Sequence, residues 1–152
     1  MATSRTAKKR ALIVCTGNAC RSQMAEALWR HEAGDEWEVA SAGTSPAGFH
    51  PLARACLEEL GLDTSGQYSK SVFSLDPASY DLVITVCDSA NESCPHFGRH
   101  PRHEHWPFPD PILAEGGPES RTVEFRRIRD LIHDRIRSFL ASERAAKGGV
   151  RS

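Results

Sequence analysis

The sequence has no long apolar run. None of its hydrophobic stretches approaches the roughly 18 to 20 residues that a membrane-spanning helix requires. The polar and basic start, MATSRTAKKR, is not followed by the uninterrupted apolar stretch of a signal peptide. We therefore expect a cytoplasmic protein that has no membrane partner.

The sequence also has no excess of charge of either sign. Its 19 basic and 20 acidic residues give a formal net charge of −1, which argues against a general nucleic-acid binder. We find no internal repeat and no linker, and a chain of 152 residues can bury about two-thirds of its unfolded surface. We expect a monomer with a single domain, 1–152, and flexible tails at about residues 1–9 and 145–152.

Cysteine, in contrast, is present in an odd number. In a chain without a secretion signal, structural disulfides are disfavoured, and cysteines are more often buried, metal-binding or catalytic. Each of the five cysteines therefore raises a question of reactivity: Cys15, Cys20, Cys56, Cys87 and Cys94.

Apolar segments with the character of strands alternate with segments of helical periodicity. We predict strands at residues 11–15, 36–43 and 81–87, a short fourth strand within HEHWPFPDP, and helices from Arg21, from Pro51 and over about 122–141. The inward faces of the last two helices are predicted to be Leu52, Ala55, Cys56 and Leu60, and Val123, Ile128, Leu131, Ile132, Ile136 and Phe139. The pattern predicts an α/β fold, a three-layer open parallel four-stranded sheet with helices on both faces.

Three residues with reactive side chains follow predicted strands. They are Cys15, Cys87 and Asp110. Because ligands of open parallel sheets bind beyond the carboxyl ends of the strands, we expect these side chains to meet at one edge.

The loop after the first strand combines a thiol with an anion-binding sequence. Small residues allow it to curl, and Asn18 tolerates a left-handed backbone, so several N–H groups can point at one anion. Arg21 adds a planar, permanently charged donor, and this positive surrounding favours the thiolate of Cys15. Ser22 is expected to donate a hydrogen bond to that sulfur. The expected oxyanion-binding residues are Thr16, Gly17, Asn18, Ala19, Cys20 and Arg21.

The octamer CTGNACRS resembles the phosphate-binding loop of low-molecular-weight protein tyrosine phosphatases and of the related thioredoxin-coupled arsenate reductases. The segments CRSQMAEAL, SAGT and HWPFPDP extend this resemblance from about residue 11 to 140. It implies a low-molecular-weight phosphatase-like fold. It also implies that Asp110, followed by Pro111, is the general acid that protonates the departing oxygen opposite the Cys15 nucleophile.

Two further cysteines favour the reductase branch. Cys87 and Cys94 match the additional cysteines of the thioredoxin-coupled arsenate reductases, and the sequence shows no cofactor motif. The resemblance implies that Cys15 attacks arsenate, that a Cys15–Cys87 disulfide forms as arsenite leaves, and that a Cys87–Cys94 disulfide is then reduced by thioredoxin. We therefore expect an arsenate reductase with no bound cofactor and a weak phosphatase side activity.

Two other functions stay open. A low-molecular-weight protein tyrosine phosphatase would share the loop and the acid, although DPILAEGG has none of the tyrosines that line a phosphotyrosine cleft in that branch. A thiol-based sensor of arsenite or metal would need a DNA-binding or partner-binding element, and none is visible in the sequence.

Three features have simpler expectations. Cys20 is expected to pack under the loop, the alternative being a rival disulfide partner for Cys15, and Cys56 is expected in the core. The histidines between residues 96 and 105 (His96, His100, His103 and His105) match no regular metal-ligand spacing, so we expect a solvated loop and no metal.

Some relatives bind potassium through residues that match Asn18, Glu26 and Ser41 and through an aspartate. Lys70 stands at the position of that aspartate, so we predict that it pairs with Glu26 and that potassium is not required.

Overall fold

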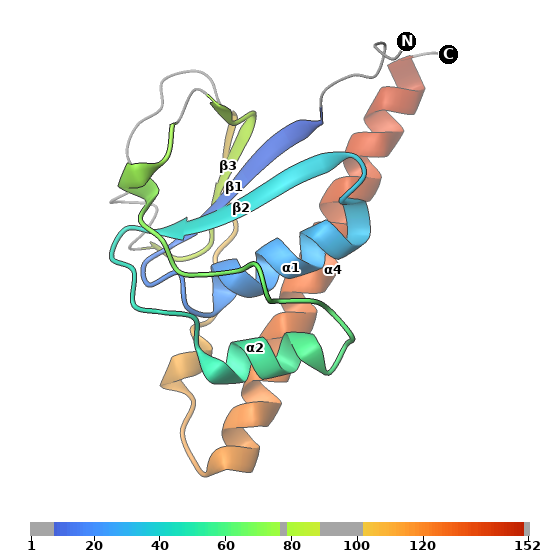
Figure 1. The fold of residues 1–152 in the computed structure, drawn as a ribbon. Coiled ribbons are helices and arrows are strands. Elements are labelled where there is room, and N and C mark those ends of the chain that lie inside the picture. The colour runs from blue at the N-terminus through green and yellow to red at the C-terminus, as the bar shows by residue number, and fades with distance from the viewer. Residues whose placement is uncertain (1–7, 77–78, 89–101, 151–152) are drawn as a thin grey trace.

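The computed structural model describes residues 8–76, 79–88 and 102–150. These residues include one four-stranded parallel sheet (Figure 1). Its strands are β1 (Lys9–Cys15), β2 (Trp37–Gly43), β3 (Leu82–Thr85) and β4 (Arg102–His105), in the order β2-β1-β3-β4. The central strand β1 is buried from Ala11 to Cys15, as expected of a parallel strand with neighbours on both sides. The predicted open parallel α/β sheet and its fourth strand are confirmed.

In the part of the chain that the structure describes, three α-helices lie on one side of the sheet, whereas helices on both faces were predicted (Figure 1). They are α1 (Arg21–Ala33), α2 (Pro51–Glu58) and α4 (Pro118–Val150), and they contact one another. Two short 3₁₀ turns, η2 (Val72–Ser74) and η4 (Pro111–Leu113), lie outside these helices. Among the described residues, no helix has the length and apolar character of a transmembrane segment.

A cluster of aromatic rings joins this helical layer to both edges of the sheet. Trp29 of α1 is fully buried and stacks on Trp106 at an interplanar angle of 9°, with ring centroids 6.1 Å apart. Trp37 and Trp29 form a T-shaped pair with ring centroids 5.2 Å apart, and Phe139 of α4 contacts all three tryptophans. These contacts hold β2, β4, α1 and α4 in fixed relative positions.

The observed inner face of α4 differs from the predicted one at two residues. Val123 and Leu131 are 60% and 40% exposed, so their assignment to the inner face was wrong. Phe125, which was missed, is fully buried in their place. The sequence contains two overlapping apolar rows on this helix, and only one of them can face the neighbouring helices. The apolar residues buried along α4 are Phe125, Ile128, Ile132, Ile136, Phe139 and Leu140.

The remaining differences concern the ends of helices. Helix α4 extends to Val150, so residues 145–150 continue the helix where a tail was expected. Helix α2 ends at Glu58 and buries Ala53, Cys56 and Leu57. Ala55 and Leu60 are exposed, so their assignment to the inner face was wrong. The predicted core position of Cys56 is confirmed.

Candidate active site

The loop between β1 and α1 curls around the sulfur of Cys15. Asn18 has a φ of 49°, and it is the only non-glycine residue with positive φ among the described residues. This left-handed turn directs the backbone N–H of Asn18 to the Cys15 sulfur, at 3.2 Å. The end of β2 approaches the loop so closely that a Cβ at Gly43 would lie 2.5 Å from the Thr16 carbonyl oxygen. Glycine at position 43 is therefore a requirement of the loop's packing.

Ser22 donates the second hydrogen bond to the same sulfur. Its hydroxyl oxygen lies 2.9 Å from Cys15 Sγ and 2.8 Å from Asn18 Nδ2. Because the amide nitrogen can only donate, the Ser22 oxygen accepts from Asn18 and its own O–H is free to donate to the sulfur. Two hydrogen-bond donors therefore point at the Cys15 sulfur. The predicted contact between Ser22 and Cys15 is present.

Cys20, the other thiol of the loop, is chemically different from Cys15. It is 3% exposed, and burial raises its pKa to about 12, with smaller contributions from the Asp110 carboxylate and the Cys15 sulfur. Arg21 acts in the opposite direction but does not offset the burial. Cys20 is therefore a protonated thiol at neutral pH, consistent with the expected packing role.

Arg21 brings the predicted general acid to the loop. Its Nη2 atom lies 3.5 Å from Asp110 Oδ2, and its Nη1 atom donates to the Phe108 carbonyl oxygen at 3.0 Å. Asp110 is also fixed by the backbone N–H of Ile112, which donates to its Oδ1 atom. The N-terminus of α1 has no side-chain cap, which leaves its N–H dipoles available to an anion. Thiol, guanidinium and carboxyl group thus surround one anion-binding loop.

Cys87 lies beside this loop, as its position after β3 predicted. Its sulfur is 3.3 Å from the Thr16 hydroxyl oxygen, and the residue is 7% exposed. Thr16 directly follows Cys15 in the chain, so the two thiols of the proposed first disulfide are neighbours of the same residue. Cys94 and the histidines His96 and His100 lie outside the described residues.

A buried polar network fixes the side chain of Asn18 behind the loop. Its Nδ2 atom also donates to Ser41 Oγ at 3.0 Å, and its Oδ1 atom accepts from the backbone N–H of Lys70 at 2.9 Å. The Ser41 hydroxyl in turn donates to Glu26 at 2.6 Å. Every polar atom of the Asn18 amide is therefore used in holding the left-handed turn.

The partner predicted for Glu26 was wrong. Arg30, one helical turn further along α1, forms the ion pair with the Glu26 carboxylate. The Lys70 ammonium instead lies over the Tyr68 ring and donates to the Tyr68 carbonyl oxygen at 3.4 Å. Burial lowers the pKa of Lys70, and the nearby Glu26 charge partly offsets this effect. The sequence signal for Arg30 was its spacing of four residues from Glu26.

Three residues that sequence analysis missed support the loop from outside. Gln23 donates to the Asn18 carbonyl oxygen at 3.0 Å, and Gln67 donates to Gln23 at 2.8 Å. The hydroxyl of Ser69 donates to the Gly17 carbonyl oxygen at 3.1 Å. Gln67 and Ser69 come from the irregular segment after α2, and nothing in their local sequence indicates this contact.

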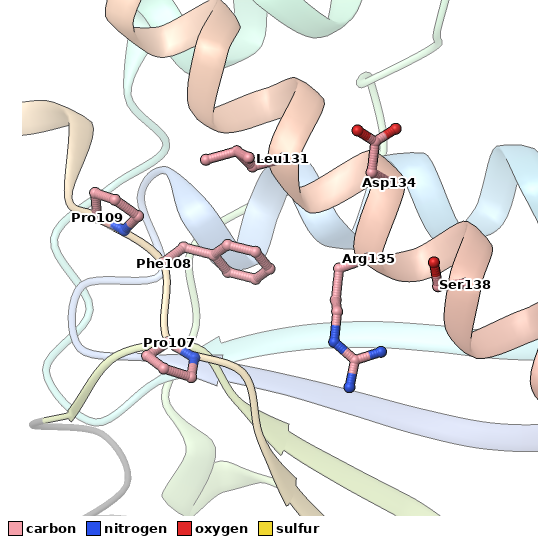
Figure 2. Close-up of a pocket in the computed structure, with 7 residues that line it drawn as sticks. All are labelled: Pro107, Phe108, Pro109, Leu131, Asp134, Arg135 and Ser138. Carbon is pink, nitrogen blue, oxygen red and sulfur yellow. The ribbon is translucent and has the colours of Figure 1, made fainter.

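A pocket of about 440 Å³ lies beside the active site, between residues 107–109 and α4 (Figure 2). The rings of Pro107, Phe108 and Pro109 form one wall, and Leu131 faces them from α4. None of the expected catalytic or oxyanion-binding residues lines it. Phe108 links it to the site, because the Phe108 carbonyl oxygen accepts a hydrogen bond from Arg21.

Comparison with known sequences places the chain in a single family. The family described as low molecular weight phosphotyrosine protein phosphatase matches residues 10–148. The arsenate reductase of Shouchella clausii is 44% identical over 132 residues, which cover 87% of this chain and 95% of that protein. The arsenate reductase of Bacillus subtilis is 43% identical over 126 residues, covering 83% and 91%.

Solved structures lead to the same group. An arsenate reductase in its oxidized state superimposes with a TM-score of 0.75 at 29% identity, covering 88% of this chain and 98% of that one. The thioredoxin-dependent arsenate reductase of Corynebacterium glutamicum gives a TM-score of 0.73 at 29% identity, covering 93% of this chain and 65% of that one. The predicted phosphatase-like fold is confirmed.

Proposed function

Because this chain belongs to the low molecular weight phosphotyrosine protein phosphatase family, we propose that it uses the family's anion-binding loop to reduce arsenate to arsenite, with thioredoxin as the electron donor. Relatives named arsenate reductases that match nearly their full length support the substrate, and the thioredoxin-dependent structural neighbour supports the donor. The observation that carries the proposal is the contact of Thr16 with Cys87, because a hydrolytic phosphatase has no use for a second thiol beside its nucleophile.

The first step is the attack of the Cys15 thiolate on the arsenic atom of arsenate. The backbone N–H groups of residues 16–20 and the Arg21 guanidinium bind the oxyanion, and Ser22 together with the Asn18 N–H holds the sulfur. The sulfur–arsenic bond forms as one arsenic–oxygen bond breaks. Asp110 supplies the proton with which that oxygen leaves as water.

The second step transfers two electrons to arsenic. The Cys87 thiolate attacks the Cys15 sulfur, a disulfide forms, and the electron pair of the broken sulfur–arsenic bond stays on arsenic, which leaves as arsenite. Cys94 then attacks Cys87 and releases the Cys15 thiolate. The dithiol of thioredoxin reduces the Cys87–Cys94 disulfide and becomes a disulfide itself, which balances the two electrons.

Hydrolysis of aryl phosphates is the second candidate activity, and the family match favours it. Phosphate has the same tetrahedral shape and charge as arsenate, so the first step can run with a phosphoester. The phosphoenzyme then needs water and does not need Cys87. We propose a weak phosphatase activity that depends on Cys15, Arg21 and Asp110 and does not need Cys87 or Cys94.

The test is a coupled assay in which the full-length protein receives arsenate, thioredoxin, thioredoxin reductase and NADPH. A parallel assay with glutathione and glutaredoxin identifies the reductant. Continuous NADPH consumption with thioredoxin is expected, and a sensor would give only a stoichiometric response. The variant Cys94→Ser should lose continuous turnover while hydrolysing 4-nitrophenyl phosphate at the normal rate.

The matched control is Cys56→Ala, which removes a buried thiol remote from the loop. It should keep both activities. Full continuous reduction by Cys94→Ser would refute the three-cysteine relay. A wild-type protein that hydrolyses the aryl phosphate but never oxidises NADPH would refute arsenate reduction and leave the phosphatase.

A further inference from the structure

Cys87 is followed by a residue that is tied to the neighbouring strand. The Asp88 Oδ1 atom lies 2.9 Å from Nε2 of His105, the last residue of β4. The opposite nitrogen of the same ring, Nδ1, lies 2.8 Å from Thr85 Oγ1 and 3.1 Å from the Thr85 carbonyl oxygen. One imidazole therefore bridges the end of β3 and the residue after Cys87.

The direction of these hydrogen bonds follows from the groups involved. An ionised carboxylate can only accept, so Nε2 carries a proton that it donates to Asp88. In the neutral ring, Nδ1 accepts from the Thr85 hydroxyl, and in the charged ring it donates to the Thr85 carbonyl oxygen. The bridge to Asp88 is therefore available in both protonation states of His105.

The main chain before Cys87 is held by the sheet. The Val86 N–H donates to the Val14 carbonyl oxygen at 2.9 Å, and the Val86 carbonyl oxygen accepts from the Phe108 N–H at 3.2 Å. On the other side of Cys87, the described contact that holds the chain is the one between Asp88 and the His105 imidazole. The Cys87 sulfur meets Thr16 between these two attachments.

From this arrangement we infer that His105 is a positioning residue for Cys87, acting through Asp88 and Thr85 to hold the Cys87 sulfur against Thr16, in place to attack Cys15. This inference deepens the proposed function and rests on it. The prediction of a solvated loop is wrong for His105, which ends β4 and whose side chain is 27% exposed and hydrogen-bonded at both ring nitrogens.

The size of the effect follows from the exposure of the pair. The Asp88 side chain is 86% exposed, so its substitution leaves the core untouched, and an exposed ion pair is worth only a small free energy. We expect the loss of the pair to slow the attack by Cys87 about two- to fivefold. Steps that involve only Cys15, Arg21 and Asp110 should keep their rates.

The experiment uses Asp88→Ala, His105→Ala and His105→Gln. The first readout is the single-turnover release of arsenite after rapid mixing with arsenate, without thioredoxin, next to the hydrolysis of 4-nitrophenyl phosphate. Asp88→Ala and His105→Ala should slow arsenite release and leave phosphate ester hydrolysis unchanged. His105→Gln, whose amide can still donate to Asp88, should restore most of the rate.

The second readout does not depend on arsenate reduction. Cys87 is only 7% exposed, so the rate at which iodoacetamide alkylates it reports how firmly its sulfur is held in place. Mass spectrometry of the Cys87 peptide measures this rate. The rate should rise about two- to fivefold in Asp88→Ala and His105→Ala. The matched control is His133→Ala, which breaks a similar histidine–carboxylate pair with Glu32 between α4 and α1.

The outcomes separate the two proposals. If the wild type releases no arsenite, the proposed function fails, and the alkylation rates still decide the role of His105. If Asp88→Ala and His105→Ala alkylate Cys87 at the wild-type rate, the positioning role is overturned. Equal losses in arsenite release and phosphate ester hydrolysis would also overturn it, because they indicate a general loss of structure.

Discussion

The Arg21 guanidinium and the Asp110 carboxylate lie 3.5 Å apart, between Nη2 and Oδ2, at the mouth of the oxyanion loop. Both side chains are largely buried, with 13% and 29% of their surfaces exposed. Arg21, which is to bind the charge of the substrate, therefore contacts Asp110, which is to protonate the leaving oxygen. An oxyanion that enters the loop therefore competes with Asp110 for Arg21.

Asp110→Asn tests this acid role. General acid catalysis contributes about 100- to 10,000-fold, so hydrolysis of phenyl phosphate should fall by at least about 100-fold. Hydrolysis of 4-nitrophenyl phosphate should fall less, because nitrophenolate leaves without a proton. Asp134→Asn, which changes an exposed carboxylate on α4, is the control and should keep both rates. An equal loss for the two esters would show that Asp110 acts by charge alone.

Ser22→Ala tests the hydrogen bond to the nucleophile. A hydrogen bond to a charged group is worth about 1.5–3 kcal/mol, so the loss of this donor should slow the attack of the Cys15 sulfur by about tenfold or more. The rate at which iodoacetamide inactivates the protein at pH 7 reports this attack. Ser74→Ala, in the exposed turn η2, is the control. An unchanged inactivation rate in Ser22→Ala would contradict the role assigned to this hydroxyl.

Cys20 should stay unreactive over the working pH range. With its pKa raised to about 12 by burial, its thiolate fraction remains negligible between pH 6 and 9 and rises only in strongly alkaline solution. Iodoacetamide labelling should therefore modify Cys15 and spare Cys20. Both residues lie in the tryptic peptide ALIVCTGNACR, so fragment ions must assign the label. Labelling of Cys20 at a rate similar to that of Cys15 at pH 7 would contradict the prediction.

Potassium should not activate the enzyme. Arg30 already balances the Glu26 carboxylate, and the Lys70 ammonium lies close enough for that charge to act on it. A second cation beside Glu26 would meet repulsion from both side chains. Steady-state reduction rates in KCl and in NaCl at equal ionic strength should agree. A severalfold higher rate in KCl would count against this assignment.

Glu59 should contribute to stability in a pH-dependent way. Its carboxylate bridges Arg126 and Arg129 and so joins α2 to α4, and hydrogen bonds from Arg126 and Arg129 hold its pKa below the ordinary value. A lowered pKa means that the contribution is complete above the unfolded-state pKa and is lost as the pH falls through the folded-state value. Glu59→Gln should lower the free energy of unfolding by about 0.5–1 kcal/mol at pH 7.

The measurement is urea unfolding of Glu59→Gln and wild type at pH 7 and near pH 3.5. The difference between the two proteins should shrink at the lower pH. Glu115→Gln, which changes another exposed carboxylate, serves as the control. A difference that is the same at both pH values would assign the effect to packing instead of charge.

Much of the nucleophile loop could be predicted from the sequence because its chemistry is local. Cys15, Asn18, Arg21 and Ser22 lie within eight consecutive positions, and the change from a strand pattern to a helical one fixes how they are arranged. The left-handed Asn18 and the Ser22 contact followed from residue type and spacing alone. The order of apolar and helical segments similarly predicted the parallel sheet.

The tertiary structure decided which distant groups meet. The contacts of Cys87 with Thr16, of Asp110 with Arg21 and of His105 with Asp88 depend on the strand order β2-β1-β3-β4, which local periodicity does not encode. Periodicity likewise indicates that α4 is amphipathic, but only the packing of α1 and α2 against it decides which apolar row is buried. Residues close in the chain share their geometry, whereas residues far apart in it are brought together by the packing of the whole domain.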